Sequence, residues 1–394
     1  MPNVDDVVIV GAARTPIGRF LGSLSKTPAP DLGAAAIRGA LRWAGIDPSE
    51  VDEVIMGNVL SAGEGMGPAR QAAITAGIPV GASAFAVNKV CASGMQAVVI
   101  GAQEILTGGA RLVAAGGMEN MSLAPHLLMN SRTGTKLGDT GLVDSAVHDG
   151  LWCAWENRHM GSSAEEIARK YGITREEQDA FALKSHRKAL TAIDAGQFRR
   201  EIEPIQVQQK GGAMLADTDE CPRRDTSAEA LARLAPAFEK GGTVTAGNAP
   251  GLCDGAAALL VTSSSLAREK GWPVRARITA WTNANLDPAW VFDAPSEAVR
   301  KLLDRSGMAM SDFDLIEVNE AFSAQVLANG KVLEWDWERV NVRGGAVALG
   351  HPIGASGARI LVTLLHALED ASLKRGMAVL CHGGGGAVAM SIER

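Results

Sequence analysis

Residues 85–117 read FAVNKVCASGMQAVVIGAQEILTGGARLVAAGG, and this stretch indicates the fold class. A short apolar run, Phe85–Val90, is followed by Cys91 and then by apolar residues at helical intervals up to a glycine pair. Leu112–Ala115 next has the composition of a buried strand that ends at two glycines. A strand, a helix and a second strand in this order are typical of α/β architecture, in which helices cover a sheet.

Similar strand and helix patterns occur on both sides of a less regular middle region, whose central part is amphipathic. We therefore predict two similar layered α/β halves with an insertion between them. Residues 1–120 form the N-terminal half, which is completed by about residues 252–273, where regular apolar character resumes. Residues 121–251 form the insertion. Residues 274–394 form the C-terminal half.

The composition excludes several classes of protein. The 394 residues carry 44 acidic and 38 basic side chains, a net charge of -6, and 46% of them are hydrophobic. This mildly acidic balance argues against a nucleic-acid or anionic-membrane partner, because those partners need a basic face. No stretch approaches the apolar length that spans a bilayer, and the N-terminus lacks the pattern of a signal peptide. We expect no nucleic acid and no membrane among the partners.

The cysteine count is low and odd for a chain of this length. A disulfide framework is therefore not expected, and a cytoplasmic location is predicted. No pair of cysteines has the spacing of zinc ligands, so we expect no metal site. The five cysteines are Cys91, Cys153, Cys221, Cys253 and Cys381.

Cys91 is the first candidate for chemistry. Its position between a strand and a helix is typical of an exposed nucleophile, and the positive end of a helix favours the thiolate. We therefore predict that the pKa of Cys91 lies below the free value of about 8.5. The alternative is a buried structural cysteine. Partner residues for Cys91 are needed to favour a nucleophile over this alternative.

Three further segments supply candidate partners. His351 lies in a glycine-rich turn entering a helix, and its pKa near neutrality suits a general base. Asn319 lies between a strand and a helix, where a simple helix cap is the alternative. Cys381 ends a strand, as Cys91 does, and precedes residues 383–386, four glycines whose amides suit an oxyanion. A plain glycine turn is the alternative for that run.

These motifs together resemble the thiolase family, in that family's order and spacing over nearly the whole chain. Within the family, the chain most resembles the acetyl-CoA acetyltransferases, and the loop at His159-Met160-Gly161 is similar to theirs. The segments are NKVCASGMQAV (88–98), GTVTAGNAPGLCDGAA (242–257), NEAFSAQ (319–325), GHPIGASGAR (350–359) and CHGGG (381–385).

The resemblance implies a thiolase fold and a reversible Claisen condensation of two acetyl-CoA molecules to acetoacetyl-CoA and CoA. It implies that Cys91 carries the acyl group as a thioester and that His351 takes the thiol proton. Cys381 would be the second acid and base, and Asn319 would hold a water that helps His351 stabilise the enolate. The backbone N–H groups of Cys91 and Gly383 would bind the acyl-enzyme oxyanion.

The resemblance also implies that residues 121–251 are a loop domain that binds CoA, which is substrate and product, with no other cofactor. A homo-oligomer, a dimer or a tetramer, is expected. The implied substrate-binding residues are His159, Met160, Arg223, Arg224, Phe238, Ala246, Pro250 and Gly251.

Three departures from the family pattern leave the acyl chain length open. Pro250 replaces a serine, His382 replaces a small or aliphatic residue, and Trp290–Pro295 replaces a segment that lines the acyl pocket. Large Trp290 and Phe292 either narrow that pocket or point elsewhere. The alternatives are a 3-ketoacyl-CoA thiolase for longer or branched chains, a non-catalytic CoA-ester-binding protein, and a cysteine hydrolase using Cys91, Asn319 and His351.

Overall fold

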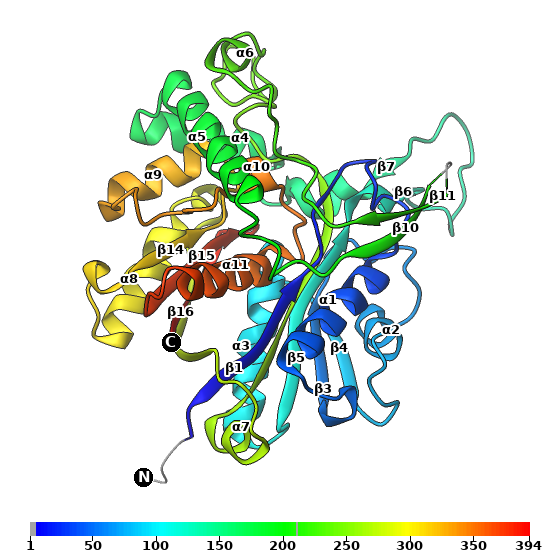
Figure 1. The fold of residues 1–394 in the computed structure, drawn as a ribbon. Coiled ribbons are helices and arrows are strands. Elements are labelled where there is room, and N and C mark those ends of the chain that lie inside the picture. The colour runs from blue at the N-terminus through cyan, green and yellow to red at the C-terminus, as the bar shows by residue number, and fades with distance from the viewer. Residues whose placement is uncertain (1–4, 210–211) are drawn as a thin grey trace.

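The computed structural model describes residues 5–209 and 212–394, and a long mixed sheet runs through it (Figure 1). Its strand order is β14-β15-β16-β13-β1-β12-β5-β3-β4, and β2 pairs with β12 beside this path. The strands are β1 (Val7–Arg14), β2 (Gly18–Arg19), β3 (Glu53–Gly57), β4 (Ser83–Val87), β5 (Leu112–Asn120), β12 (Cys253–Ser263), β13 (Ala276–Asn285), β14 (Leu315–Val318), β15 (Arg375–His382) and β16 (Gly386–Glu393).

The sheet consists of two halves that repeat one topology. In the series β1-β12-β5-β3, the first two pairings are antiparallel and the third is parallel. The series β13-β16-β15-β14 has the same order of pairings. A short antiparallel contact between β1 and β13, at Val8↔Arg277 and Ile9↔Ala276, joins the halves. The prediction of two similar halves is confirmed.

Helices cover both faces of the sheet and also separate its halves. Helices α3 (Ser93–Thr107) and α11 (Ser356–Asp370) pack on each other in the middle layer (Figure 1). Helices α1 (Ala29–Ala44) and α2 (Pro68–Thr75) cover the outer face of the first half, and α8 (Ala294–Ser306) covers that of the second. The layers therefore follow the order αβαβα, and the prediction of layered α/β halves is confirmed.

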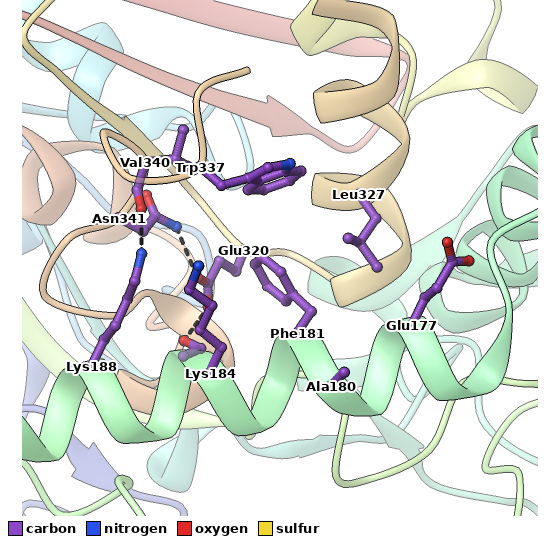
Figure 2. A pocket seen from close by; sticks show the side chains of 11 residues that line it. Glu177, Ala180, Phe181, Lys184, Lys188, Glu320, Leu327, Trp337, Val340 and Asn341 are labelled. Atoms are coloured by element: carbon purple, nitrogen blue, oxygen red, sulfur yellow. Dashed lines mark hydrogen bonds between the residues drawn. The ribbon is translucent and has the colours of Figure 1, made fainter. Parts of the chain in front are cut away.

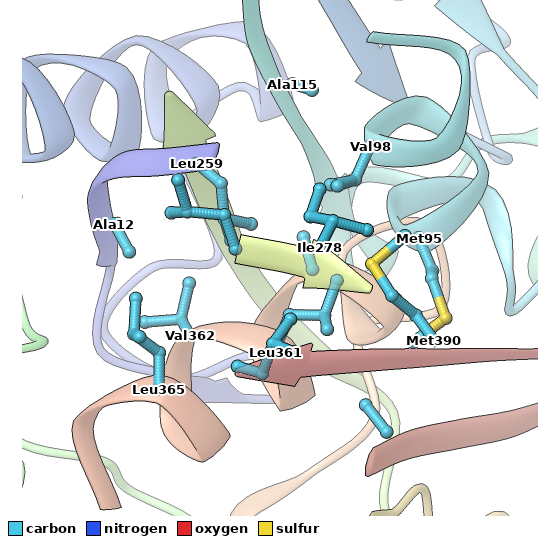
Figure 3. Close-up of a cluster of buried hydrophobic side chains, with 14 of the residues drawn as sticks. Ala12, Met95, Val98, Ala115, Leu259, Ile278, Leu361, Val362, Leu365 and Met390 are labelled. Carbon is cyan, nitrogen blue, oxygen red and sulfur yellow. The ribbon is translucent and has the colours of Figure 1, made fainter. Parts of the chain in front are cut away.

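Apolar side chains fill the spaces between the layers. Successive residues of a strand point to opposite faces, so Ala378 and Leu380 of β15 join the middle cluster while Met377 and Val379 join the outer one. Figure 3 shows the middle cluster, where Leu361 from α11 lies near residues of several strands. Fully burying one such leucine contributes about 1.5–3 kcal/mol.

The hydropathy of α3 differs from our expectation. Val90–Thr107, which is α3 with the three residues before it, is 18 residues long with a mean hydropathy of 1.2, enough by length and composition alone to cross a membrane. The expectation that no stretch approaches this length was wrong. Half of that window is buried inside the protein, because α3 occupies the middle layer between the two halves of the sheet. Core packing therefore explains its apolar character.

The two middle helices open with the same three residues, Ala-Ser-Gly, and approach each other closely there. A Cβ atom on Gly94 would lie 2.8 Å from the backbone nitrogen of Ala358, and one on Gly357 would lie 2.5 Å from that of Met95. Only glycine permits this approach. In this repeat the counterpart of Cys91 is Gly354, so the likeness of Cys91 and Cys381, each expected at the end of a strand, is not part of the repeat.

Residues between β5 and β12 form helices and short strand pairs over one edge of the molecule (Figure 1). The region predicted to be irregular contains a hairpin of strands β10 and β11, described below with the other elements of the region. It forms because Ile205 and Val207 alternate with polar residues and pack on the outer core of the first half. The remaining elements of this region are β6 (His126–Leu127), β7 (Val143–Asp144), β8 (Trp152–Cys153), β9 (Arg158–His159), α4 (Met160–Tyr171), α5 (Arg175–Asp194), β10 (Ile205–Gln209), β11 (Gly212–Ala216) and α6 (Ala228–Ala232). Outside it lie α7 (Ser264–Lys270), α9 (Ser323–Leu333) and α10 (Ala346–Leu349).

Candidate active site

A cavity of about 90 Å³ lies where the segments that precede α3 and α11 face the end of β15. Cys91, His351, Cys381 and Gly383 all line it, so residues from both halves of the chain converge there. Asn319 lies directly behind His351, with its Nδ2 atom 3.4 Å from His351 Nε2. The arrangement gathers two thiols, one imidazole and one amide at a single point.

A strained turn presents Cys91 to this cavity. Val90 has φ of 47°, which is unfavourable for a β-branched residue. The Ser93 hydroxyl donates to the Val90 carbonyl at 2.6 Å and accepts from the backbone N–H of Lys89 at 2.8 Å, which holds the turn closed. Helix α3 begins at Ser93, so Cys91 precedes the helix and does not open it. The predicted strand-to-helix elbow is present.

The protonation state of Cys91 differs from the prediction. Burial raises the pKa of the thiol to about 12, and the charge of Glu119 acts in the same direction. The N–H groups of Gly383 and of Cys91 itself lower the pKa, but by less. The predicted low pKa was wrong, because loss of hydration outweighs the helix end and both N–H donors.

We expect alkylation of Cys91 by iodoacetamide to accelerate steadily as the pH rises, without reaching a plateau in the range where the fold is stable. The reason is that only the thiolate reacts and the pKa of Cys91 is about 12. Mass spectrometry of the Cys91 peptide at a series of pH values measures the rate, and the Cys91→Ala variant gives the background from other thiols. A plateau near or below about 8.5, the free value, would contradict this expectation.

His351 is held in a form that can accept a proton. The Ser356 hydroxyl donates to the Pro352 carbonyl at 2.9 Å, so it accepts a hydrogen from His351 Nδ1 at 2.5 Å. The lone pair is therefore on Nε2. Burial and the charge of Arg359 lower the pKa of His351 to about 3, so the imidazole is neutral near pH 7. A neutral imidazole whose Nε2 carries the lone pair can act as a general base, and Asn319 Nδ2 contacts that nitrogen at 3.4 Å.

Asn319 is buried and incompletely hydrogen-bonded. Its Oδ1 atom has no partner among the residues that the structure describes. Helix α9 begins at Ser323 with Phe322 as its cap residue, so the alternative of Asn319 as a helix cap was wrong. A buried amide oxygen without a partner suits an ordered water.

Cys381 and the glycines after it close the cavity. Burial raises the pKa of Cys381 well above its ordinary value, and the nearby Cys91 thiol adds to this. The N–H of Gly383 points at the Cys91 sulfur. Gly384 and Gly385 both have φ of 88°, so this tight turn between β15 and β16 requires glycine.

The predicted substrate-binding residues divide between two adjoining cavities. His159, Met160, Phe238, Pro250 and Gly251 line the inner cavity with the catalytic candidates. The outer cavity, of about 700 Å³, is lined by Arg223, Arg224 and Ala246. The two cavities share Ala249, Gly251 and Leu252, so they adjoin at these residues.

Comparison with known proteins identifies the family. The thiolase N-terminal domain model matches residues 7–265, and the thiolase C-terminal domain model matches residues 272–394. This chain belongs to the thiolase family. It is 56% identical to the acetyl-CoA acetyltransferase of Pseudomonas aeruginosa over 392 residues, 99% of this chain and 100% of that protein. It is 52% identical to that of Cupriavidus necator over 390 residues, 99% of each protein.

Solved structures agree on the thiolase fold. The acetyl-CoA acetyltransferase of Bacillus anthracis has a TM-score of 0.97 and 43% identity, with 99% of each chain covered. Human mitochondrial 3-ketoacyl-CoA thiolase has the same TM-score with 40% identity, again over 99% of each chain. The fold alone therefore does not separate thiolases of different names.

The departures from the thiolase pattern affect this site unequally. Phe292 lines the inner cavity, whereas Trp290 is 42% exposed and lies under the Lys170 ammonium at 4.3 Å. Of the two aromatic side chains, only Phe292 narrows the pocket. His382 also lines the cavity and does not face outward, and burial lowers its pKa. Pro250 lines the same cavity.

Sequence reasoning missed Glu119, whose hydrogen bonds connect two segments of this thiolase's site. Its carboxylate accepts from the backbone N–H groups of Gly354 at 2.8 Å and of Leu60 at 3.0 Å, and from Asn58 Nδ2 at 3.2 Å. It thereby fastens the loop after β3 to the turn that opens α11. Burial raises the pKa of Glu119 to about 8. The available signal was a lone acidic residue within the apolar run of β5.

A separate cavity of about 320 Å³ lies between α5 and α9 (Figure 2). Phe181, Lys184 and Trp337 line it, and none of the predicted site residues does. Glu320, which also lines it, accepts from the Ser185 hydroxyl at 2.8 Å and from the Val347 N–H at 3.0 Å. Glu320 thereby fixes the segment beside Asn319 to α5 and α10.

Proposed function

We propose that this thiolase is an acetyl-CoA C-acetyltransferase that reversibly condenses two acetyl-CoA molecules to acetoacetyl-CoA and CoA. The observation that carries the proposal is the convergence of two thiols and a neutral imidazole on one narrow cavity. Relatives at 52% and 56% identity carry the same activity in their names, which supports it. A non-catalytic CoA-ester-binding protein would have no need of this set of groups.

In the first half-reaction, Cys91 attacks the acetyl carbonyl of acetyl-CoA. Because the thiol and the imidazole are both neutral at rest, the proton passes from the Cys91 sulfur to His351 Nε2 as the sulfur–carbon bond forms. The N–H groups of Cys91 and Gly383 bind the oxyanion, and loss of one such donor raises the barrier by about 3–4 kcal/mol. CoA then leaves with the proton, and the acetyl group remains on Cys91.

In the second half-reaction, Cys381 passes its thiol proton to His351, and the resulting thiolate removes an α-proton from a second acetyl-CoA. The enolate oxygen lies toward His351 and a water held by the Asn319 amide, and its carbon attacks the thioester on Cys91. Collapse of that intermediate breaks the bond to the Cys91 sulfur and releases acetoacetyl-CoA. His351 gives its proton to the Cys91 sulfur when acetoacetyl-CoA leaves. The reverse sequence is thiolysis, in which Cys381 returns a proton to the departing acetyl-CoA carbon.

The two adjoining cavities support CoA as the group that carries the acyl chain. CoA has a bulky phosphorylated head and a thin arm, which correspond to a wide outer and a narrow inner cavity. Arg224 already pairs with Asp194 at 2.6 Å, so we propose Arg223 as the contact to the head. The sparse cysteines support a cytoplasmic location. The exposed Phe85 on the edge strand β4 supports a homodimer or a larger oligomer.

Thiolysis assays on the purified protein test this function. We expect acetoacetyl-CoA to be cleaved faster than 3-ketohexanoyl-CoA and longer esters. The reason is that Phe292 and Phe322, whose ring centroids are 5.5 Å apart, narrow the inner cavity. The comparison of kcat/KM across chain lengths gives the result. A preference for 3-ketohexanoyl-CoA or longer esters would identify a 3-ketoacyl-CoA thiolase instead.

A further inference from the structure

Two cysteines that the proposed mechanism does not use lie in contact. The Sγ atoms of Cys221 and Cys253 are 3.4 Å apart. Cys253 is fully buried at the start of β12, whereas Cys221 lies in the loop after β11 and lines the outer cavity. The two sulfur atoms of a disulfide are about 2 Å apart, so a small side-chain movement brings this pair to bonding distance.

The Cys253 sulfur packs against the turn that carries His351. The sulfur accepts a hydrogen bond from the backbone N–H of His351. Its own S–H donates to the Gly251 carbonyl at 3.2 Å. A Cβ atom at Gly350 would lie only 2.4 Å from this sulfur, so the turn rests directly on it. A movement of Cys253 toward Cys221 therefore withdraws a hydrogen-bond acceptor from the backbone of the general base.

We propose that Cys221 and Cys253 are an oxidation site that forms a reversible disulfide and thereby slows the enzyme. The disulfide itself follows from the contact of the two sulfurs. Its effect on turnover rests on the proposed function, because the bond shifts the His351 turn and the wall of the outer cavity where CoA is proposed to bind.

The chemistry requires a peroxide as oxidant. Hydrogen peroxide oxidises the accessible Cys221 thiol to a sulfenic acid, and one water leaves. The Cys253 sulfur then attacks the Cys221 sulfur, the sulfur–oxygen bond breaks, and a second water leaves with the proton of Cys253. Two equivalents of a thiol reductant reverse the reaction. CoA in the outer cavity covers Cys221 and slows the first step.

The first test detects the bond without reference to activity. The Cys91→Ala/Cys381→Ala double variant, which lacks the other close thiol pair, is treated with hydrogen peroxide, alkylated and digested. We expect mass spectrometry to find a linked Cys221–Cys253 peptide that dithiothreitol removes. Its absence at peroxide concentrations that oxidise the free thiol of glutathione would overturn the proposal. This result stands even if the chain has no thiolase activity.

The second test measures the effect on turnover. Each protein is compared with its own reduced form, so differences in basal activity do not enter. Peroxide is expected to lower the thiolysis rate of the wild type on the order of 10- to 100-fold, because a shift of about 1 Å at a catalytic group has effects of this size. The dithiothreitol-reversible part of this loss should be smaller in Cys221→Ser and in Cys253→Ser, in which only Cys91 and Cys381 remain as a close thiol pair. An equal reversible loss in both variants, or a linked wild type at full activity, would overturn the regulatory role.

Discussion

Replacing Cys381 by alanine should separate the two half-reactions. Cys91 is expected to take an acetyl group from acetyl-CoA as before, while formation of acetoacetyl-CoA falls by about 10²- to 10⁴-fold, the usual contribution of a general acid or base. The physical reason is that acyl transfer uses Cys91, His351 and two N–H donors, whereas only the α-proton step uses Cys381. Mass spectrometry of the intact protein measures the acyl-enzyme, and a coupled assay measures condensation.

A matched control for this variant is Cys153→Ala. Cys153 is a buried thiol that lines neither the inner nor the outer cavity, so its loss should leave both half-reactions unchanged. Condensation at the wild-type rate in Cys381→Ala would refute the role proposed for this thiol. Release of free acetate at the wild-type turnover rate would instead identify a cysteine hydrolase.

The Cys91→Ala variant should lose thiolysis and acylation together. Loss of a covalent nucleophile costs on the order of 10⁶-fold in turnover in a well-studied hydrolase, and Cys381, the other thiol that lines this cavity, is proposed to serve the α-proton step instead. Intact-protein mass spectrometry should show no acetyl adduct after incubation with acetyl-CoA. The same preparation should keep the thermal unfolding midpoint of the wild type within a few degrees, because the substitution removes a single sulfur from a cavity wall.

Two results would contradict this second prediction. An acetyl adduct on Cys91→Ala would show that another residue, such as Cys381, accepts the acyl group. Thiolysis within about tenfold of the wild type, a barrier change of only about 1.4 kcal/mol, would exclude covalent catalysis through Cys91.

Much of the architecture follows from patterns that are local in the sequence. The run from Phe85 to Leu112 predicts strand, helix and strand, and the motifs at Asn319 and His351 mark the ends of two further elements. The likeness of Cys91 and Cys381, each expected at the end of a strand, does not mark the repeat, because Ala-Ser-Gly at the starts of α3 and α11 does so. The residues around Cys91 were also expected to converge, and the structure brings them to one cavity.

The features of the site that local patterns do not predict depend on contacts between distant parts of the chain. A helix end near Cys91 predicts a lowered pKa, but the apolar wall that reverses the shift includes Met121 and Ile353, which are far away in sequence. The position of Glu119 beneath α11 is a tertiary contact of the same kind. Whether Trp290 or Phe292 faces the cavity depends on how α8 packs.

The crossing of α3 and α11 has a consequence for the order of biosynthesis. His351 and Cys381 follow Cys91 by 260 and 290 residues, so a ribosome finishes the nucleophile long before its partners are translated. Until then the Cys91 thiol lacks the second helix that encloses it, and it is open to solvent and electrophiles. During translation the nascent chain therefore passes through an interval in which the Cys91 thiol is exposed. In that interval it also lacks the partners that it is proposed to need for catalysis.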